Sequence, residues 1–199
     1  MKFLIATNNM NKLSEIKHIL APLGIEGISL SDAGVVSSPE ETGTTFEDNA
    51  RIKAMDGMHV TGMPTVADDS GLMVDALHGA PGVYSARYAG EGASDADRIN
   101  KLIYEMRDVP AGARTARFVC AVCCVFPDGN IITARGECEG AIAFQRQGSG
   151  GFGYDPVFVE KTTGRSFAML AGEEKDRLSH RGKALAVFAK LLDKRCIGR

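Results

Sequence analysis

The sequence predicts an α/β fold, more specifically an α+β arrangement in which helices flank a mixed β-sheet. Short apolar runs typical of buried strands alternate with segments in which apolar residues recur every three or four positions, as in amphipathic helices. A hairpin in the second half of the chain indicates an antiparallel part of the sheet. The 199 residues correspond to one domain, 1–199. We expect an elongated central sheet with two lobes and a cleft between them, a common ligand site.

Each element of the first half has a local signal. An apolar run opens the chain, and Gly24 is a favourable C-terminal cap for the helix that follows it. Thr45 is a favourable N-cap, with Glu47 and Asp48 in the first turn behind it. These signals predict, in order, a strand over 2–7, a helix ending at Gly24, a short strand within 25–44, a helix over 45–62, and strands over 64–67 and 72–75.

The second half has equally clear signals. Ser94 and Asp97 have the spacing of a capping box. The turn 127–130, Pro-Asp-Gly-Asn, separates two strand-like runs. The expected elements are a helix from Ser94 that ends before Pro110, strands over 115–126 and 130–139, a glycine-rich loop over 148–153, a strand over 157–159 and a helix over 181–194.

Composition excludes several classes of protein. The 23 basic and 25 acidic side chains give a net charge of −2, which argues against binding to a nucleic-acid backbone. No apolar run approaches the roughly 20 residues of a membrane span, and the N-terminus lacks the pattern of a signal peptide. The five cysteines are an odd number, so we expect buried free thiols in a cytoplasmic protein rather than disulfides or a metal site.

The N-terminal motif Thr7-Asn8-Asn9-Met10-Asn11-Lys12 lies between a strand and a helix. Unpaired backbone N–H groups at a helix start favour anions, and Lys12 adds a positive charge. The motif therefore suggests a phosphate site. The alternative is an Asn-rich N-cap followed by a solvated lysine.

Acidic residues occur at two places. Asp68 and Asp69 follow an apolar strand, where carboxylates are well placed to bind a hard cation such as Mg²⁺, although a continuing strand would point them in opposite directions. Glu40 and Glu41 lie on a loop before Gly43. Lys53 is four residues after Asn49, on the same helix face, and is a second candidate phosphate ligand. The alternatives are a turn, a solvated acidic loop and a surface lysine.

Two further segments suggest recognition of a base. The run 150–156, Gly-Gly-Phe-Gly-Tyr-Asp-Pro, presents Phe152 on a flexible backbone, where a base would stack on it. Lys175 and the segment 179–182, Ser-His-Arg-Gly, offer donors to carbonyl oxygens. The alternatives are a turn with Phe152 folded inward and a capped helix with exposed polar residues. Together, the segments describe a nucleoside triphosphate site that recognises its base.

These motifs, in this order, resemble the inosine triphosphate pyrophosphatase family and its bacterial dITP/XTP pyrophosphatases. The matching segments are 7–12, 67–71 (Ala-Asp-Asp-Ser-Gly), 79–87 (Gly-Ala-Pro-Gly-Val-Tyr-Ser-Ala-Arg), 150–156 and 179–182. The resemblance implies Mg²⁺-dependent hydrolysis of ITP, dITP and XTP to the monophosphate and pyrophosphate. It also implies a homodimer that cleanses the nucleotide pool.

The resemblance assigns roles to individual residues. Asp69 is implied as general base and metal ligand, Glu40 as the second metal ligand with Glu41 as the alternative, and Asp68 as a support for the metal through water. Residues that are implied to hold phosphates or to touch the substrate are Thr7, Asn8, Asn9, Met10, Asn11, Lys12, Lys53 and Ser70. The implied base pocket consists of Phe152, Gly153, Tyr154, Asp155, Lys175, His180 and Arg181.

Three other functions compete with this one. A pyrophosphatase for modified pyrimidine triphosphates is disfavoured only by the resemblance of segment 179–182. A non-hydrolytic nucleotide sensor would need no acidic metal ligands. An RNA-binding protein fits the Phe152 platform but not the acidic charge balance.

Overall fold

The computed structural model describes the backbone of residues 1–197 and the side chains up to residue 195. Within this range the strands form a six-stranded sheet in the order β2-β1-β3-β4-β5-β6. Strand β1 pairs in parallel with β2 and β3, whereas β5 and β6 are antiparallel. The prediction of a mixed sheet is confirmed. The strands are β1 (Lys2–Ile5), β2 (Glu26–Ser29), β3 (Thr65–Val74), β4 (Thr115–Val125), β5 (Ile131–Ile142) and β6 (Phe158–Glu160).

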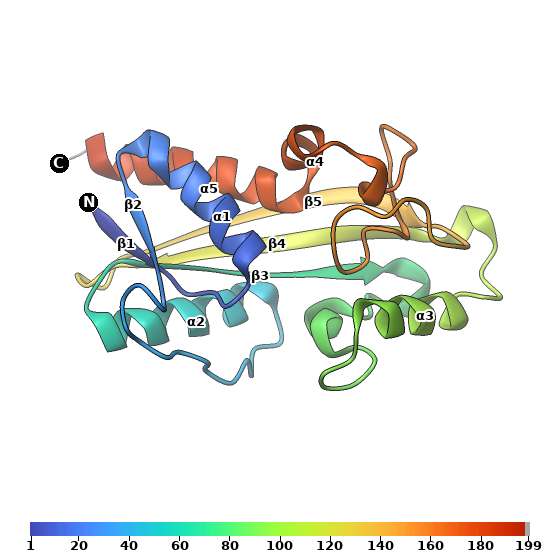
Figure 1. Cartoon of the computed structure of the whole chain (residues 1–199), viewed down its shortest axis with the longest axis horizontal. Coiled ribbons are helices and arrows are strands. Elements are labelled where there is room, and N and C mark those ends of the chain that lie inside the picture. Colours follow the sequence, from blue (N-terminus) through green and yellow to red (C-terminus); the bar gives the residue numbers. More distant parts are fainter. Residues whose placement is uncertain (198–199) are drawn as a thin grey trace. The chain divides into compact units, whose positions relative to one another are not determined.

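The α-helices flank this sheet (Figure 1), and two of them begin at the predicted N-caps. The Thr45 side chain accepts a hydrogen bond from the Asp48 amide, and Ser94 forms the capping box with Asp97. Gly24 takes the left-handed conformation that ends the first helical segment. The helices are α1 (Met10–Leu20), α2 (Phe46–Thr61), α3 (Asp95–Glu105), α4 (Gly172–Leu178) and α5 (His180–Ile197).

One prediction of secondary structure was wrong, and one helix was missed. The strands expected over 64–67 and 72–75 are one continuous strand, β3, because the carboxylates of Asp68 and Asp69 are buried among cations and need no turn to reach water. Helix α4 was not predicted. It is short, and none of its side chains is buried, so it lacks an apolar face.

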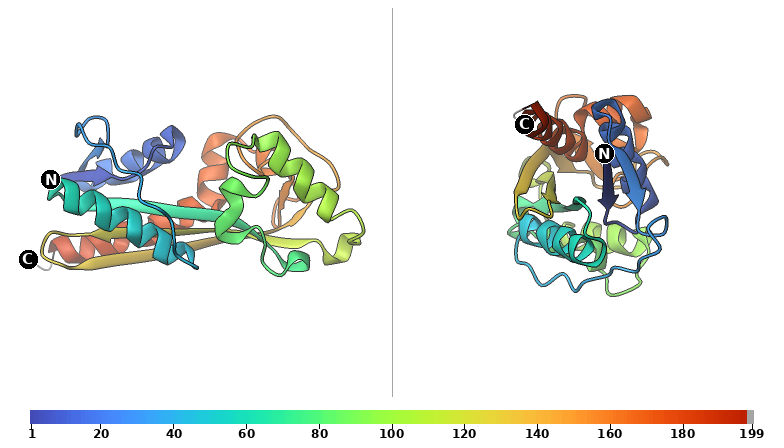
Figure 2. Two further views of the ribbon diagram at one scale, coloured as in Figure 1. Left: turned by 90° about the horizontal axis from the view of Figure 1, so that it is seen from below. Right: turned by 90° about the vertical axis from the view of Figure 1, so that its left-hand side faces the viewer.

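The chain divides into two compact units. Unit 1 comprises residues 1–69, 120–136 and those from 181 onward. Helices α1 and α5 cover one face of its strands and α2 covers the other (Figures 1 and 2). The first face has an apolar core that includes Ile16, Val122 and Phe188. On the other face Gly57 permits close packing, because a Cβ there would lie 2.9 Å from Leu4 Cδ2.

Unit 2 comprises residues 70–119 and 137–180. Its core joins α3 to the remaining parts of the strands, with side chains such as Leu72, Leu102, Phe118 and Phe158. The prediction of free thiols is confirmed for four buried cysteines, and the side chain of Cys196 lies outside the described residues. These four are Cys120, Cys123, Cys124 and Cys138. In residues 1–197, none of the helices combines the length and the apolar character needed to cross a membrane.

Candidate functional site

The strand register brings the N-terminal motif to the acidic pair. Ile5 of β1 lies opposite Val66 of β3, and the Ala6 amide donates to Val66 O at 2.8 Å. The chain after β1 therefore emerges beside Asp68 and Asp69. Ligands commonly bind beyond the carboxyl ends of parallel strands in α/β sheets.

Asp68 and Asp69 point to opposite faces of β3, as successive residues of a strand must. Asp68 faces α1 and α5. One of its oxygens lies 2.9 Å from Lys12 Nζ and 3.5 Å from Arg181 Nε. Arg181 also contacts Glu15 at 2.8 Å. Asp68 is fully buried, and Arg181 nearly so, so this group is an ionic cluster shielded from solvent.

Asp69 faces α2 on the other side. The Asn49 amide donates to Asp69 Oδ2 at 3.2 Å, and Lys53 Nζ lies 3.3 Å from Asp69 Oδ1. Lys53 also contacts Glu41 at 2.8 Å. The spacing of four residues along α2 thus places an amide and a cation on the same carboxylate. Lys12 and Lys53 are both mostly buried ion-pair partners, so the alternatives of solvated lysines are wrong.

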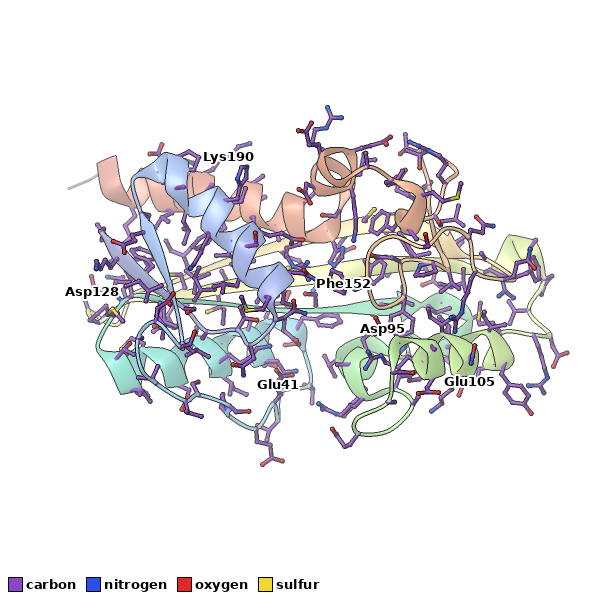
Figure 3. The ribbon with its side chains drawn as sticks, in the orientation of Figure 1. Glu41, Asp95, Glu105, Asp128, Phe152 and Lys190 are labelled. Atoms are coloured by element: carbon purple, nitrogen blue, oxygen red, sulfur yellow. The ribbon has the colours of Figure 1, made fainter. Side chains whose placement is uncertain are left out.

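The two neighbouring glutamates differ in position. Glu40 is exposed, whereas Glu41 is partly buried and contacts Lys53, which in turn contacts Asp69. Figure 3 labels Glu41. The geometry therefore favours Glu41 over Glu40 as the second acidic residue of this group.

The two aspartates have shifted pKa values in opposite directions. Burial raises the pKa of Asp69, and the charge of Glu41 raises it further against the opposing effect of Lys53. Burial would also raise the pKa of Asp68, but Lys12, Arg181 and Lys53 hold it far below its usual range. Asp68 is thus a fixed negative charge, whereas Asp69 is a stronger base than an ordinary aspartate.

Asn49 was missed as a site residue, although its spacing from Lys53 was the available signal. It is fully buried, and its Oδ1 accepts from the Gly43 amide at 2.9 Å while its Nδ2 donates to Asp69. A Cβ at Gly43 would lie 2.6 Å from that Oδ1. The Asn49 side chain therefore holds both the loop of Glu40 and Glu41 and the candidate catalytic residue Asp69.

We expect Asn49→Ala to destabilise the protein by about 1–3 kcal/mol, because it leaves the partly buried Gly43 amide without its acceptor and the buried Asp69 carboxylate without a donor. Chemical denaturation monitored by circular dichroism measures this. The control is Arg51→Ala, at an exposed position of the same helix, for which a change within about 0.5 kcal/mol is expected. Equal stability of both variants would contradict the anchoring role.

The N-terminal motif contains the expected helix cap. Asn9 is the N-cap of α1, and its side chain accepts from the amides of Asn11 and Lys12. Thr7 Oγ1 accepts from the Asn9 amide at 3.2 Å. Asn8, Met10 and Asn11 are exposed. The cap is confirmed, and the segment presents a positively polarised helix start to solvent.

The glycine-rich run lies in unit 2 and is held by charged groups. Asp155 Oδ2 accepts from the Phe152 amide at 2.9 Å and lies 2.6 Å from Lys175 Nζ. The same ammonium lies 5.0 Å from the centroid of the half-buried Phe152 ring. Phe152 thus has a cation at its ring and a backbone fixed by Asp155.

His180 belongs to an aromatic stack in unit 2. Its ring lies 4.7 Å from that of Phe118 at an interplanar angle of 12°, and Phe118 stacks in turn on Phe167. His180, Arg181 and Ser179 are all buried, so the alternative of exposed residues at the helix start is wrong. Tyr154 is buried and donates from its hydroxyl to Ser85 O at 2.9 Å.

The remaining predicted residues occupy different places. Gly153 has a φ of 59° and open space at the Cβ position. Ser70 is partly buried and directly follows Asp69 on β3. Arg181, expected at the base, makes its described charged contacts with Glu15 and Asp68 in unit 1.

Two carboxylates of the site could contribute to binding a hard cation. In the part of the chain with described side chains, no three His, Cys, Asp or Glu residues group closely enough to hold an ion. Glu41 and Asp69 nevertheless share one cationic partner, the Lys53 ammonium. Mg²⁺ keeps several waters and is commonly bound by one or two carboxylates together with substrate phosphates. Two carboxylates on one positive group fit that requirement.

Comparisons with known proteins show the family of the chain. The model of the Ham1 family matches residues 3–191, nearly the whole described chain. The chain belongs to the Ham1 family. A dITP/XTP pyrophosphatase from Exiguobacterium sibiricum is 47% identical over 185 residues, 93% of either chain. One from Salmonella typhimurium is 44% identical over 193 residues, 96% of this chain and 98% of the other.

Solved Ham1 structures have the same fold. A HAM1 protein from Coxiella burnetii has a TM-score of 0.91 at 39% identity and covers 98% of this chain and 99% of its own. The Staphylococcus aureus Ham1 protein has a TM-score of 0.90 at 37% identity, with coverage of 98% and 100%. The resemblance inferred from the motifs is therefore confirmed at the level of family and fold.

Proposed function

We propose that this Ham1 protein is a nucleoside triphosphate pyrophosphatase. It hydrolyses non-canonical purine nucleoside triphosphates such as ITP, dITP and XTP to the monophosphate and pyrophosphate. The observation that carries the proposal is the dipeptide Asp68-Asp69, which places a cation-bearing cluster on each face of β3. The names of the relatives support the same activity.

The groups of unit 1 suit the triphosphate. In the structure, carboxylates pair with the ammonium groups of Lys12 and Lys53. The triphosphate must therefore compete with these carboxylates for the two lysines. We expect both ammonium groups to turn toward the phosphates, with the start of α1 as a further anion site. Their charge then opposes the negative charge that develops at the α-phosphate.

Asp69 is the general base of the proposed mechanism. Its raised pKa makes it better able to take a proton from a water positioned for attack at the α-phosphate. When bound, Mg²⁺ would supply charge neutralisation of the phosphates. Asp69 and either Glu41 or Glu40 would hold it, and the contact of Glu41 with Lys53 favours Glu41. Asn49 keeps the Asp69 carboxylate oriented throughout.

The groups of unit 2 suit a purine base. Phe152 offers a ring for stacking, which contributes about 1–3 kcal/mol per base. Tyr154 and Asp155 hold the loop of Phe152 and Gly153, and Lys175 lies over the ring. His180 is a candidate donor to the 6-oxo group of hypoxanthine and xanthine. A donor placed there is left unpaired by the 6-amino group of adenine, which a buried site rejects strongly.

A substrate panel tests the proposed activity. The protein is incubated with Mg²⁺ and ITP, dITP, XTP, GTP, ATP or dUTP, and release of pyrophosphate and of phosphate is measured separately. Pyrophosphate from ITP, dITP and XTP, with little from the others, is the expected result. Binding without hydrolysis would identify a sensor, and preference for dUTP a pyrimidine enzyme. Omission of Mg²⁺ should abolish the release.

Two variants separate stacking from edge recognition. Phe152→Ala should lower kcat/KM for all purine triphosphates by a similar factor, because every base has a π-face. His180→Ala should instead lower the ITP/ATP ratio of kcat/KM by about tenfold. Arg181→Ala is less informative, since it also disturbs the Asp68 cluster. If the ITP/ATP ratio of kcat/KM is unchanged in His180→Ala, another donor distinguishes ITP from ATP, and Lys175 is the next candidate.

We also propose a cytoplasmic homodimer, as the family resemblance implies. Light scattering on a size-exclusion column should give twice the 21.2 kDa of one chain. A mass of one chain at micromolar concentration would contradict the dimer without bearing on the activity.

A further inference from the structure

The glycine-rich loop that carries Phe152 is bound by the carboxylate of a residue outside the loop. Asp95, the first residue of α3, accepts a hydrogen bond from the Gly153 amide at Oδ2, at a distance of 2.7 Å. Figure 3 labels Asp95 and Phe152 in the same part of unit 2. Asp155 binds the loop from within, through the Phe152 amide. The two amides of consecutive residues are thus held by two different aspartates.

Asp95 is itself fixed by its neighbours. Arg98, three residues along α3, pairs with the other oxygen of Asp95 and donates to Ala86 O at 2.6 Å. Burial would raise the pKa of Asp95, but the hydrogen bonds from Arg98 and Gly153 keep it below its usual value. The carboxylate is therefore ionised and oriented.

These contacts give a role to the motif 79–87, which the proposed mechanism does not use. In this segment, Ala86 O accepts a hydrogen bond from the Arg98 guanidinium, and Ser85 O accepts one from the Tyr154 hydroxyl. Ser85 Oγ in turn accepts from the Leu72 amide of β3 at 2.9 Å. Segment 79–87 thus connects β3 to the end of the glycine-rich loop, at Tyr154 directly and at Gly153 through Arg98 and Asp95.

The loop needs such an anchor because of its glycines. Gly151 and Gly153 have φ values of 73° and 59°, where other residues are strained. A Cβ at Gly151 would lie 2.0 Å from Asp155 Oδ2. Glycine is required for this path, yet glycine also has the largest conformational entropy to lose. A loop that is ordered before binding avoids that cost when the ligand arrives.

We propose that Asp95 is a positioning residue for purine recognition, which fixes the Gly153 backbone and so sets the Phe152 ring in place for stacking. The role rests on the proposed function, since it concerns the same nucleotide. Asp95 is not expected to touch the substrate. It acts through Phe152, and Arg98 acts through Asp95.

A matched control lies on the same helix turn. Asp97 also has its carboxylate at the start of α3, where it accepts from the Ser94 amide at 3.0 Å, and none of its described hydrogen bonds reaches the loop. Asp95→Ala and Asp97→Ala thus both weaken the helix start, but only the first frees the loop. Hydrogen exchange followed by mass spectrometry should show about tenfold faster exchange over 150–155 in Asp95→Ala only. Equal exchange in the two variants would overturn the proposal.

Kinetics test the link to the purine. In Asp95→Ala, KM for ITP should rise about tenfold while kcat changes less than threefold, and Asp97→Ala should match the wild type. Asp95→Asn keeps an acceptor oxygen for Gly153 and should recover most of the loss. With Phe152→Ala as background, Asp95→Ala should have little further effect.

The outcomes distinguish this role from the activity itself. A wild-type protein that releases no pyrophosphate from any purine triphosphate would refute the proposed function, while the exchange experiment would still decide whether Asp95 holds the loop. If the wild type is active and the loop loosens, but KM for ITP stays unchanged, then Asp95 does not serve purine recognition. Should Asp95→Ala fold poorly, Arg98→Ala removes the partner of Asp95 and allows the same comparison, with smaller expected effects.

Discussion

Asp69→Asn is expected to lower kcat for ITP by about 10³-fold or more in this Ham1 protein. The substitution preserves shape but removes both the proposed general base and one of two carboxylates beside Lys53. Loss of a general base alone costs about 10²–10⁴-fold. Steady-state pyrophosphate release at saturating ITP and Mg²⁺ measures the effect.

The folded state should tolerate this substitution. Because burial raises the pKa of Asp69 in the folded protein, the ionised carboxylate is disfavoured there relative to the unfolded chain at neutral pH. A neutral amide does not carry that cost, and its oxygen can still accept from Asn49. Thermal denaturation should therefore give a Tm equal to or above that of the wild type. A stable variant with near-normal turnover would show that the base is another residue.

The sequence predicted most of the fold because local signals agree with the tertiary structure. Thr45 and Ser94 are N-caps as expected, and Gly24 ends its helical segment in the left-handed conformation. The errors arise where tertiary contacts override local chemistry. Two adjacent aspartates predict a turn, but cations on both faces of β3 stabilise them within a strand.

Several residues of the candidate site were named from the sequence, but their contacts were not. Spacing along a helix identified Lys53, and spacing along a strand put Asp68 and Asp69 on opposite faces. The choice between Glu40 and Glu41 needed the structure, since both lie on one loop. So did Asn49 and Asp95, because their partners, Gly43 and Gly153, are backbone amides that no side-chain pattern reveals.

Asp68→Ala is expected to cause the largest loss of stability among the variants considered, about 3–5 kcal/mol. The Asp68 side chain is completely buried, and its Lys12 and Arg181 partners are 16% and 6% exposed. Without Asp68, these two cations face each other with one carboxylate fewer and no compensating access to water. Urea denaturation should show this loss of stability. Thermal denaturation should show a fall in Tm of roughly 10 °C.

A surface ion pair provides the contrast. Lys2 and Glu26 lie 3.6 Å apart, and each side chain is 63% exposed, so Glu26→Ala should change stability by less than about 1 kcal/mol. In a double variant, Lys12→Met should recover part of the loss in Asp68→Ala, because it removes one of the cations that Asp68 had balanced. If Asp68→Ala proves as stable as Glu26→Ala, other groups hold Lys12 and Arg181. The cluster around Asp68 then does not stabilise the part of β3 on which the proposed active site depends.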